Sequence, residues 1–145
     1  MVQVVTRHGE KINVADRVAR VSNLFASMMD ENGDEDIPLP WEADQVHQVI
    51  YILIVLTDAS ATIHQCFPNL SLTRDILTAI SKVLPLLDFI DAQPAVTLIH
   101  TFIRETFASA TTPEDVIQIC FEAFDEMPPT KQRAIFELCL TYIPF

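Results

Sequence analysis

The hydrophobic residues alternate with polar ones near the N-terminus and then recur at helical spacing over most of the chain. Residues 2–4 and 12–14 place valine or isoleucine at every second position, and the pair His8 and Gly9 lies between them. Such alternation is typical of strands with one buried face, and His8 and Gly9 can supply the positive φ angles of a two-residue turn. The pattern predicts a β-hairpin. A helix from Asp16 follows, with an apolar stripe at Val18, Val21, Leu24, Phe25 and Met28.

A proline-containing strand is expected next, directly before the most apolar helix. Pro38 and Pro40 have no backbone N–H, so residues 37–41 can pair along one side only, as an edge strand does. Residues 42–57 then predict a helix that is apolar on nearly every face. Its uninterrupted apolar run is shorter than the roughly 20 residues that a bilayer requires. We therefore expect this helix to be buried in protein on all sides.

Prolines divide the rest of the chain into further helices. Residues 58–69 predict a connection with room for one extra turn. Ser71 begins the next helix, and Pro85 is expected to kink or end it. Pro94 begins another helix, because proline fits the first helical turn. The order so far is strand, strand, helix, strand and then helices.

The C-terminal region contains two predicted helices, each with more apolar surface than one core face needs. Thr112 suits an N-cap and Pro113 the first helical position, which predicts a helix over residues 113–124; residues 130–142 predict the last helix. A terminal helix of a small monomer needs to bury one side only. The surplus stripes predict a partner surface, with a thick core as the alternative. These stripes hold Ile117 and Phe121 on the first helix, and Phe136, Leu140 and Ile143 on the second.

Length and charge limit the classes of function. The 145 residues, half of them hydrophobic, are enough for one domain with a real core. A net charge of −11 disfavours binding to nucleic acids and to anionic membranes, which require a basic face. No secretory signal pattern opens the chain. Three widely spaced cysteines, an odd number, fit a reducing compartment, so we expect the cytoplasm and nucleus.

Sequence motifs for catalysis and metal binding are missing. Gly9 and Gly33 are the only glycines, which excludes a glycine-rich phosphate loop. Residues 30–36 are acidic but lack the glycine and glutamate positions of an EF-hand. The four histidines fall in separate elements without metal-ligand spacing. We expect no enzyme activity, no cofactor and no metal, and we expect Cys120 and Cys139 to act as small hydrophobic residues.

In their order, these features resemble the Skp adaptors of cullin-RING ubiquitin ligases and, more distantly, elongin C. The turn His8-Gly9-Glu10 stands where Skp proteins have Asp-Gly-Glu, and the strand Ile37-Pro-Leu-Pro40 where they have Val-Pro-Leu-Pro. The helix start Thr112-Pro113-Glu114-Asp115 is similar to their Thr-Pro-Glu-Glu. The resemblance implies an α+β, BTB/POZ-like domain over residues 1–110, with a small three-stranded sheet packed by helices. It also implies a C-terminal helical extension over residues 111–145.

The resemblance implies a non-enzymatic adaptor that binds an F-box protein through its C-terminal helices and can link it to a cullin. A stable BTB-type homodimer is not expected, because the first strand already begins at Val2 and leaves no preceding residues to exchange. The implied F-box contacts are the apolar residues of the last helices: Phe102, Ile103, Phe107, Ile117, Phe121, Phe124, Phe136, Leu140 and Ile143.

One departure from the family concerns the cullin. Skp proteins have an Asn-Tyr pair that helps to dock the cullin, and Pro85 and Leu86 replace it here. These two residues and Trp41 are the expected cullin-facing positions. F-box binding is therefore better supported than cullin binding. One alternative is a Skp-like scaffold that holds an F-box protein in a non-ligase assembly, for example in chromosome segregation. Another is an enzyme whose site is assembled only by the fold.

Overall fold

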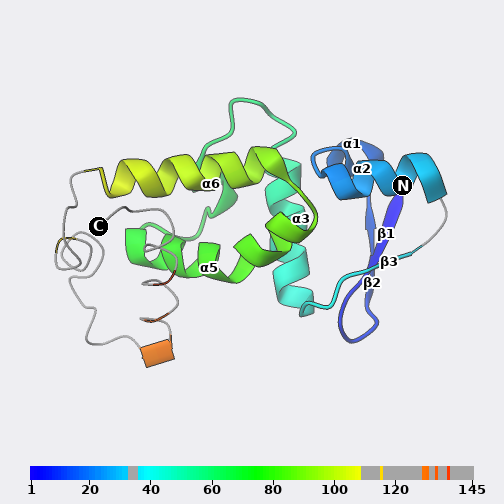
Figure 1. Ribbon diagram of the computed structural model, residues 1–145, viewed down its shortest axis with the longest axis horizontal. Helices are drawn as coiled ribbons and strands as arrows, with labels where there is room; N and C mark the ends of the chain where they lie inside the picture. Colours follow the sequence, from blue (N-terminus) through cyan, green and yellow to red (C-terminus); the bar gives the residue numbers. More distant parts are fainter. Residues whose placement is uncertain (33–35, 109–114, 116–128, 131–132, 134–136, 138–145) are drawn as a thin grey trace.

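The computed structural model describes residues 1–32, 36–108, 115, 129–130, 133 and 137 (Figure 1). Within this part of the chain the fold is α+β, with a small three-stranded mixed sheet and six helices, which confirms the expected class. Figure 1 shows the sheet with α1 and α2 on one side of α3, and α5 and α6 on the other. The elements are β1 (Val2–Val5), β2 (Lys11–Val14), α1 (Asp16–Ala19), α2 (Asn23–Asn32), β3 (Ile37–Pro38), α3 (Ala43–Val55), α4 (Ile63–Cys66), α5 (Thr73–Phe89) and α6 (Gln93–Thr106).

The central strand of the sheet is β1. It pairs antiparallel with β2, with Val2 opposite Val14, and parallel with β3, with Val4 opposite Ile37. Beyond β3, the Leu39 N–H donates to the Val5 carbonyl at 2.8 Å. Residues 37 and 39 are buried and residues 38 and 40 exposed, so the prolines face away from the core. The prediction of a proline-containing edge strand is confirmed for the described sheet.

The connection between β1 and β2 is longer than the two-residue turn expected from the sequence. The strands end at Val5 and begin again at Lys11, while the Thr6 N–H donates to the Glu10 carbonyl at 2.8 Å. Gly9 has φ +85°, but His8 does not share this left-handed conformation. The prediction for His8 is therefore wrong. Gly9 provides the left-handed position in this loop, which glycine adopts without a steric penalty.

The first predicted helix is divided into α1 and α2. Ser22, fully buried, lies between them. Its hydroxyl accepts a hydrogen bond from the Phe25 N–H at 3.1 Å and donates to the Ile90 carbonyl at 2.5 Å. A serine in this position is an N-cap, because it satisfies a backbone N–H that has no partner inside the helix. The hydrophobic spacing alone is compatible with one continuous helix and did not reveal this break.

The N-terminus of α2 is bound to the turn between α5 and α6. The Asn23 N–H donates to the Asp91 carbonyl and the Leu24 N–H to the Ile90 carbonyl, each at 3.1 Å. Asp91 has φ +53°, and its carboxylate accepts hydrogen bonds from the side chains of Asn23 at 2.9 Å and Gln93 at 2.5 Å. These bonds join the part of the fold that carries the sheet to the α5 and α6 pair. Figure 1 shows the turn between α5 and α6 next to α2.

Replacing Ser22 with alanine is expected to lower the free energy of unfolding by about 0.5 to 2 kcal/mol, because the N-cap of α2 is lost. Ser27 provides the matched control: it is exposed on the same helix. Its replacement with alanine should cost nothing, since alanine favours helices more than serine. Denaturant unfolding of the two variants measures the difference. Equal stabilities would contradict the role of the Ser22 hydroxyl.

The carboxylate of Asp91 is expected to make stability depend on pH. Hydrogen bonds from Gln93 and then Asn23 hold its pKa below the ordinary aspartate value. The stabilisation is therefore complete above the ordinary aspartate pKa and is lost as the pH falls through the lower pKa of the folded state. Melting temperatures of the wild type and Asp91→Asn across this acidic range should converge as the pH falls. A constant difference would contradict the prediction.

The central helix α3 is buried on one side only. Val46, Val49, Ile52 and Leu53 face the core, where α3 contacts α1, α4 and α5. Tyr51 and Ile54 are 40% and 50% exposed. The expectation of burial on all sides is therefore wrong. Apolar residues occur on nearly every face of α3, but the neighbouring helices among the described residues cover only part of its circumference.

The remaining described helices follow the sequence pattern with one difference. The extra turn after the central helix is α4, which begins with a capping box between Thr62 and Gln65. Proline lies in the first turn of α6, as predicted. Pro85, in contrast, does not end α5, which continues to Phe89. The other part of the prediction was a kink, and in Figure 1 the last turns of α5 depart from the direction of its earlier turns, as expected of a helix that contains a proline.

The two predicted C-terminal helices lie outside the described residues, apart from single positions. Among those positions, Arg133 Nε lies 3.5 Å from Glu137 Oε1, an i,i+4 ion pair with both side chains exposed. The boundary near residue 110 therefore stays a prediction. Within the described part of the chain, no helix combines the length and apolar character needed to cross a bilayer.

Candidate protein-binding surface

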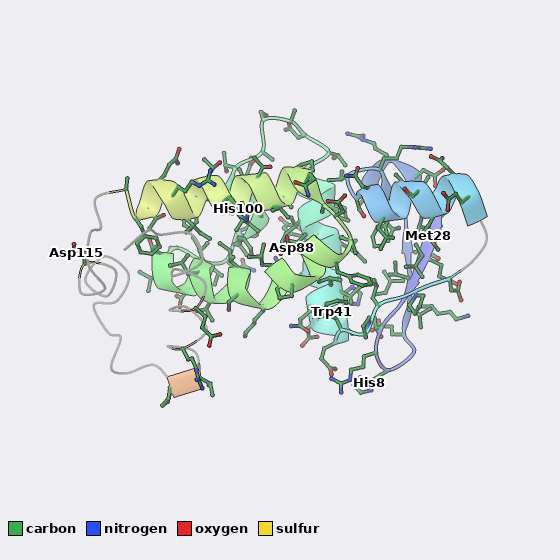
Figure 2. The ribbon with its side chains drawn as sticks, viewed as in Figure 1. His8, Met28, Trp41, Asp88, His100 and Asp115 are labelled. Atoms are coloured by element: carbon green, nitrogen blue, oxygen red, sulfur yellow. The ribbon has the colours of Figure 1, made fainter. Side chains whose placement is uncertain are left out.

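An exposed apolar surface forms where the start of α3 meets the end of α5. The rings of Trp41 and Phe89 lie with centroids 5.2 Å apart and planes tilted by 53°. Phe89 is 52% exposed, and Pro85, one helical turn before it, is exposed as well. Figure 2 labels Trp41 at the start of α3 and Asp88 in the last turns of α5, on these neighbouring elements. We call Trp41, Pro85 and Phe89 together the Trp41 surface.

Backbone hydrogen bonds hold the Trp41 surface in place. The Trp41 N–H donates to the Leu39 carbonyl at 2.8 Å, and the Trp41 carbonyl accepts from the Arg7 N–H at 2.9 Å. The Gln45 side chain donates to the Lys82 carbonyl at 3.1 Å and thereby joins α3 to α5. The end of α5 is fixed by the turn that binds α2. A partner would therefore meet a surface whose shape is already set, which lowers the entropic cost of binding.

Polar side chains of the hairpin loop contact α3 and the residue before it, Glu42, which follows Trp41. Glu42 lies 3.5 Å from Arg7 Nη1 and 3.0 Å from His8 Nε2. Glu10 lies 3.3 Å from His47 Nε2. All five side chains are at least half exposed, so each pair contributes at most about 1 kcal/mol to stability. These pairs orient the hairpin loop against the start of α3 and leave the apolar rings uncovered.

Of the three residues predicted to face a cullin, two lie on the Trp41 surface. Trp41 is partly exposed and Pro85 exposed, whereas Leu86 is 0% exposed. The prediction for Leu86 is corrected in this respect: one position along a helix turns the side chain by about 100°, here from solvent into the core. Phe89 was missed in the sequence. It is four residues after Pro85, a spacing that places both on one helix face.

The predicted F-box contacts on α6 are mostly internal. Phe102 is partly exposed and lies edge to face with the ring of His64, at a centroid distance of 6.5 Å. Ile103 and Phe107 are buried, so a partner could reach them only if neighbouring residues moved. Their assignment as F-box contacts stays a prediction. The other six contacts lie outside the described residues: Ile117, Phe121, Phe124, Phe136, Leu140 and Ile143.

A second exposed apolar site lies on α3, where the sequence predicted burial. Tyr51 and Ile54 are three residues apart and share the uncovered face of this helix. His47, one turn before Tyr51, is exposed on the same face and contacts Glu10 of the hairpin loop. The hydrophobic pattern did not indicate that Tyr51 and Ile54 are exposed, because their side chains are as apolar as those of the buried residues beside them.

The thiol of Cys66 is buried. Burial raises the pKa of the Cys66 thiol to about 11, so the thiol stays protonated at neutral pH and is a poor nucleophile. Within the described ranges, no group of three or more histidine, cysteine, aspartate and glutamate side chains is placed to hold a metal ion.

Comparison with known proteins assigns no relative: neither a protein-family model nor a curated protein matches this chain.

Proposed function

We propose that this chain is a non-enzymatic adaptor of the Skp type, with a BTB/POZ-like fold, which holds the F-box of a partner protein through its C-terminal helices. The main support is the order of elements. A hairpin, two short helices, an edge strand with Pro38 and the apolar helix α3 form one three-stranded mixed sheet with its helices. The sequence resemblance implies a hairpin, one helix, an edge strand and a further helix in this order, and here the one helix is divided into α1 and α2. Such an adaptor acts in the cytoplasm and nucleus.

Isolation of the complex from native extract tests this function. The tagged chain should recover an F-box protein, identified by mass spectrometry, and the purified pair should remain associated in gel filtration. Failure to bind any F-box domain, either in extract or as a purified pair, would contradict the proposal. Turnover of a small molecule by the isolated chain would instead support an enzyme.

A second candidate is a scaffold that holds an F-box protein outside a ubiquitin ligase. The observation that favours it is the exchange of the family's Asn-Tyr pair for Pro85 and Leu86. Pro85 is exposed without a hydrogen-bonding side chain, and Leu86 is buried. Copurification separates the two functions: a cullin together with an F-box protein indicates a ligase, and an F-box protein alone indicates the scaffold.

Direct titration with a cullin N-terminal domain is expected to show weak or no binding. Each interfacial hydrogen bond lost with the Asn-Tyr pair weakens binding by about 0.5 to 1.5 kcal/mol, and more where a partner group stays buried and unpaired. A Skp protein that has the pair serves as the positive control in the same calorimetric experiment. Nanomolar affinity of this chain would contradict the prediction: either Pro85 and Leu86 do not occupy the position of the family's Asn-Tyr pair, or apolar contacts of Trp41 and Leu86 replace the lost hydrogen bonds.

A further inference from the structure

We propose that two copies of this chain pair through the outer edges of their β2 strands, antiparallel, so that their two sheets become one. The sheet has the order β2-β1-β3, and no described strand lies on the outer side of β2. The inference rests on this sheet alone and is independent of the proposed adaptor function. The pairing exchanges no strand, so it differs from the BTB-type homodimer that the sequence does not predict.

The hydrogen bonds of the central strand β1 show which of its residues face β2. The Val5 carbonyl accepts from the Leu39 N–H at 2.8 Å, so Val5 directs its main-chain groups toward β3. The Thr6 N–H donates to the Glu10 carbonyl at 2.8 Å, on the opposite side. Neighbouring residues of a strand direct their main-chain groups to opposite sides. The residues two and four positions before Thr6 therefore face β2.

The register then identifies the outward groups of β2. Val4, two positions before Thr6, lies opposite Ile12. Because residues that face each other in this way direct their main-chain groups toward each other, Ile12 and Val14 face β1. Lys11 and Asn13 alternate with them and face away from β1. Their two N–H and two C=O groups form the outer edge of the described sheet.

The side chains of the same two residues leave this edge open. Lys11 Nζ lies 3.4 Å from Asp36 Oδ2, and Asn13 Oδ1 accepts from Gln3 Nε2 at 3.1 Å. Gln3 belongs to β1, and Asp36 directly precedes β3. Both side chains are therefore held over the exposed face of the sheet and do not extend beyond its edge.

The two edges of the sheet differ in their protection against pairing with another strand. Pro38 and Pro40 lie at the β3 edge, where proline cannot donate a backbone hydrogen bond. The four residues of β2, all described, include no proline, and their one-to-one register with β1 has no bulge. Soluble proteins usually block an exposed edge by such devices. An edge that has none favours pairing with an extended strand.

A second copy of β2 satisfies all four outward groups. With a two-fold axis beside Ile12, Lys11 of each copy lies opposite Asn13 of the other, and such a pair exchanges two hydrogen bonds. The two Ile12 side chains, partly buried on the core side of the sheet, then meet across the axis. Lys11 meets an uncharged amide, and Asp36 offsets its charge within its own copy.

Removal of one outward N–H tests the pairing. Asn13→Pro removes this donor and places a ring at the edge, while the hydrogen bonds between β1 and β2 are kept. Asn13→Ala is the matched control, because it loses the same contact with Gln3 but keeps the N–H. Wild-type self-association should weaken at least about tenfold in Asn13→Pro and less than about twofold in Asn13→Ala.

Analytical ultracentrifugation of the full chain over a concentration series measures this self-association. The net charge of −11 on each copy opposes it at long range. The experiment is therefore done at physiological ionic strength, where charges are screened beyond about 8 Å. A wild type that stays monomeric at every concentration, or Asn13→Pro that associates as the wild type does, would overturn the proposal.

Disulfide crosslinking gives a second test that does not depend on how proline affects folding. Ile12→Cys places the two introduced thiols in a directly opposed pair, with Cβ atoms about 4.5 to 5.5 Å apart, close to disulfide geometry. In the control Asn13→Cys, the two thiols are offset by two residues, beyond the roughly 7 Å between Cα atoms that a disulfide can span. Under mild oxidation, Ile12→Cys should give a dimer linked at this position, identified by mass spectrometry. Equal crosslinking of both variants, or none of Ile12→Cys, would overturn the proposed register.

Discussion

Replacing Leu53 with alanine is expected to lower the free energy of unfolding by about 2 to 5 kcal/mol. Leu53 is fully buried in α3, the helix that contacts α1, α4 and α5. Removal of its side chain leaves a cavity between α3 and the helices packed against it, and these helices cannot all move inward to fill it. Unfolding in guanidinium chloride, followed by far-ultraviolet circular dichroism, measures the loss. If the slope of the free energy of unfolding against denaturant concentration equals that of the wild type, the unfolded states of the two proteins are comparable.

Ile54 is the matched control, because it is the next residue of the same helix and is 50% exposed. Ile54→Ala removes a side chain of equal size, but the stability should change by only about 0.5 kcal/mol. The ratio of the two losses in the free energy of unfolding tests which side of α3 faces the core. Comparable losses in the free energy of unfolding at both positions would contradict the exposure of Ile54. They would instead support the burial of α3 on all sides that its sequence predicted.

The elements that sequence rules predicted correctly are those determined by local chemistry. Pro38 and Pro40 cannot donate backbone hydrogen bonds, and that restriction alone places their strand at an edge of the described sheet. Alternating valines predicted the hairpin, and a proline predicted the first turn of α6. In each case a residue excludes most conformations regardless of what surrounds it.

The wrong predictions concern features that depend on a contact with a distant part of the chain. Ser22 divides the first helix because its hydroxyl reaches Ile90, a residue far along the chain. Tyr51 and Ile54 are exposed because no described helix covers that face of α3. Periodicity identifies residues that share a face, but it gives no information on whether another element lies against that face.

The candidate site shows the same division between local pattern and tertiary contact. The family resemblance led to Trp41 and Pro85, which both reach the surface, and also to Leu86, which does not. Phe89, at the end of α5, completes the surface through its contact with Trp41, which lies just before α3. Helical spacing from Pro85 could have suggested Phe89, whereas the pairing with Trp41 required the fold.

Aspartate at Phe121 or Phe136 is expected to abolish F-box binding without unfolding the protein. Both residues lie outside the described part of the chain, on the surplus apolar stripes of the two predicted C-terminal helices. Aromatic anchors of interfaces typically lose 2 kcal/mol or more on truncation, and a charge without a counterion in the same pocket adds to the loss. Titration with an F-box domain and thermal unfolding of the free protein are measured for each variant.

Two control variants distinguish a loss of folding from a loss of F-box binding. Ile103 is fully buried in α6, so Ile103→Asp should lower the melting temperature of the free protein regardless of any partner. Phe89→Asp changes an exposed phenylalanine on the Trp41 surface and should leave F-box binding unchanged. If Phe121→Asp and Phe136→Asp melt early, as Ile103→Asp does, these side chains belong to the core and the surplus stripes form a thick core instead. If both variants fold and bind normally, the F-box docks on another face.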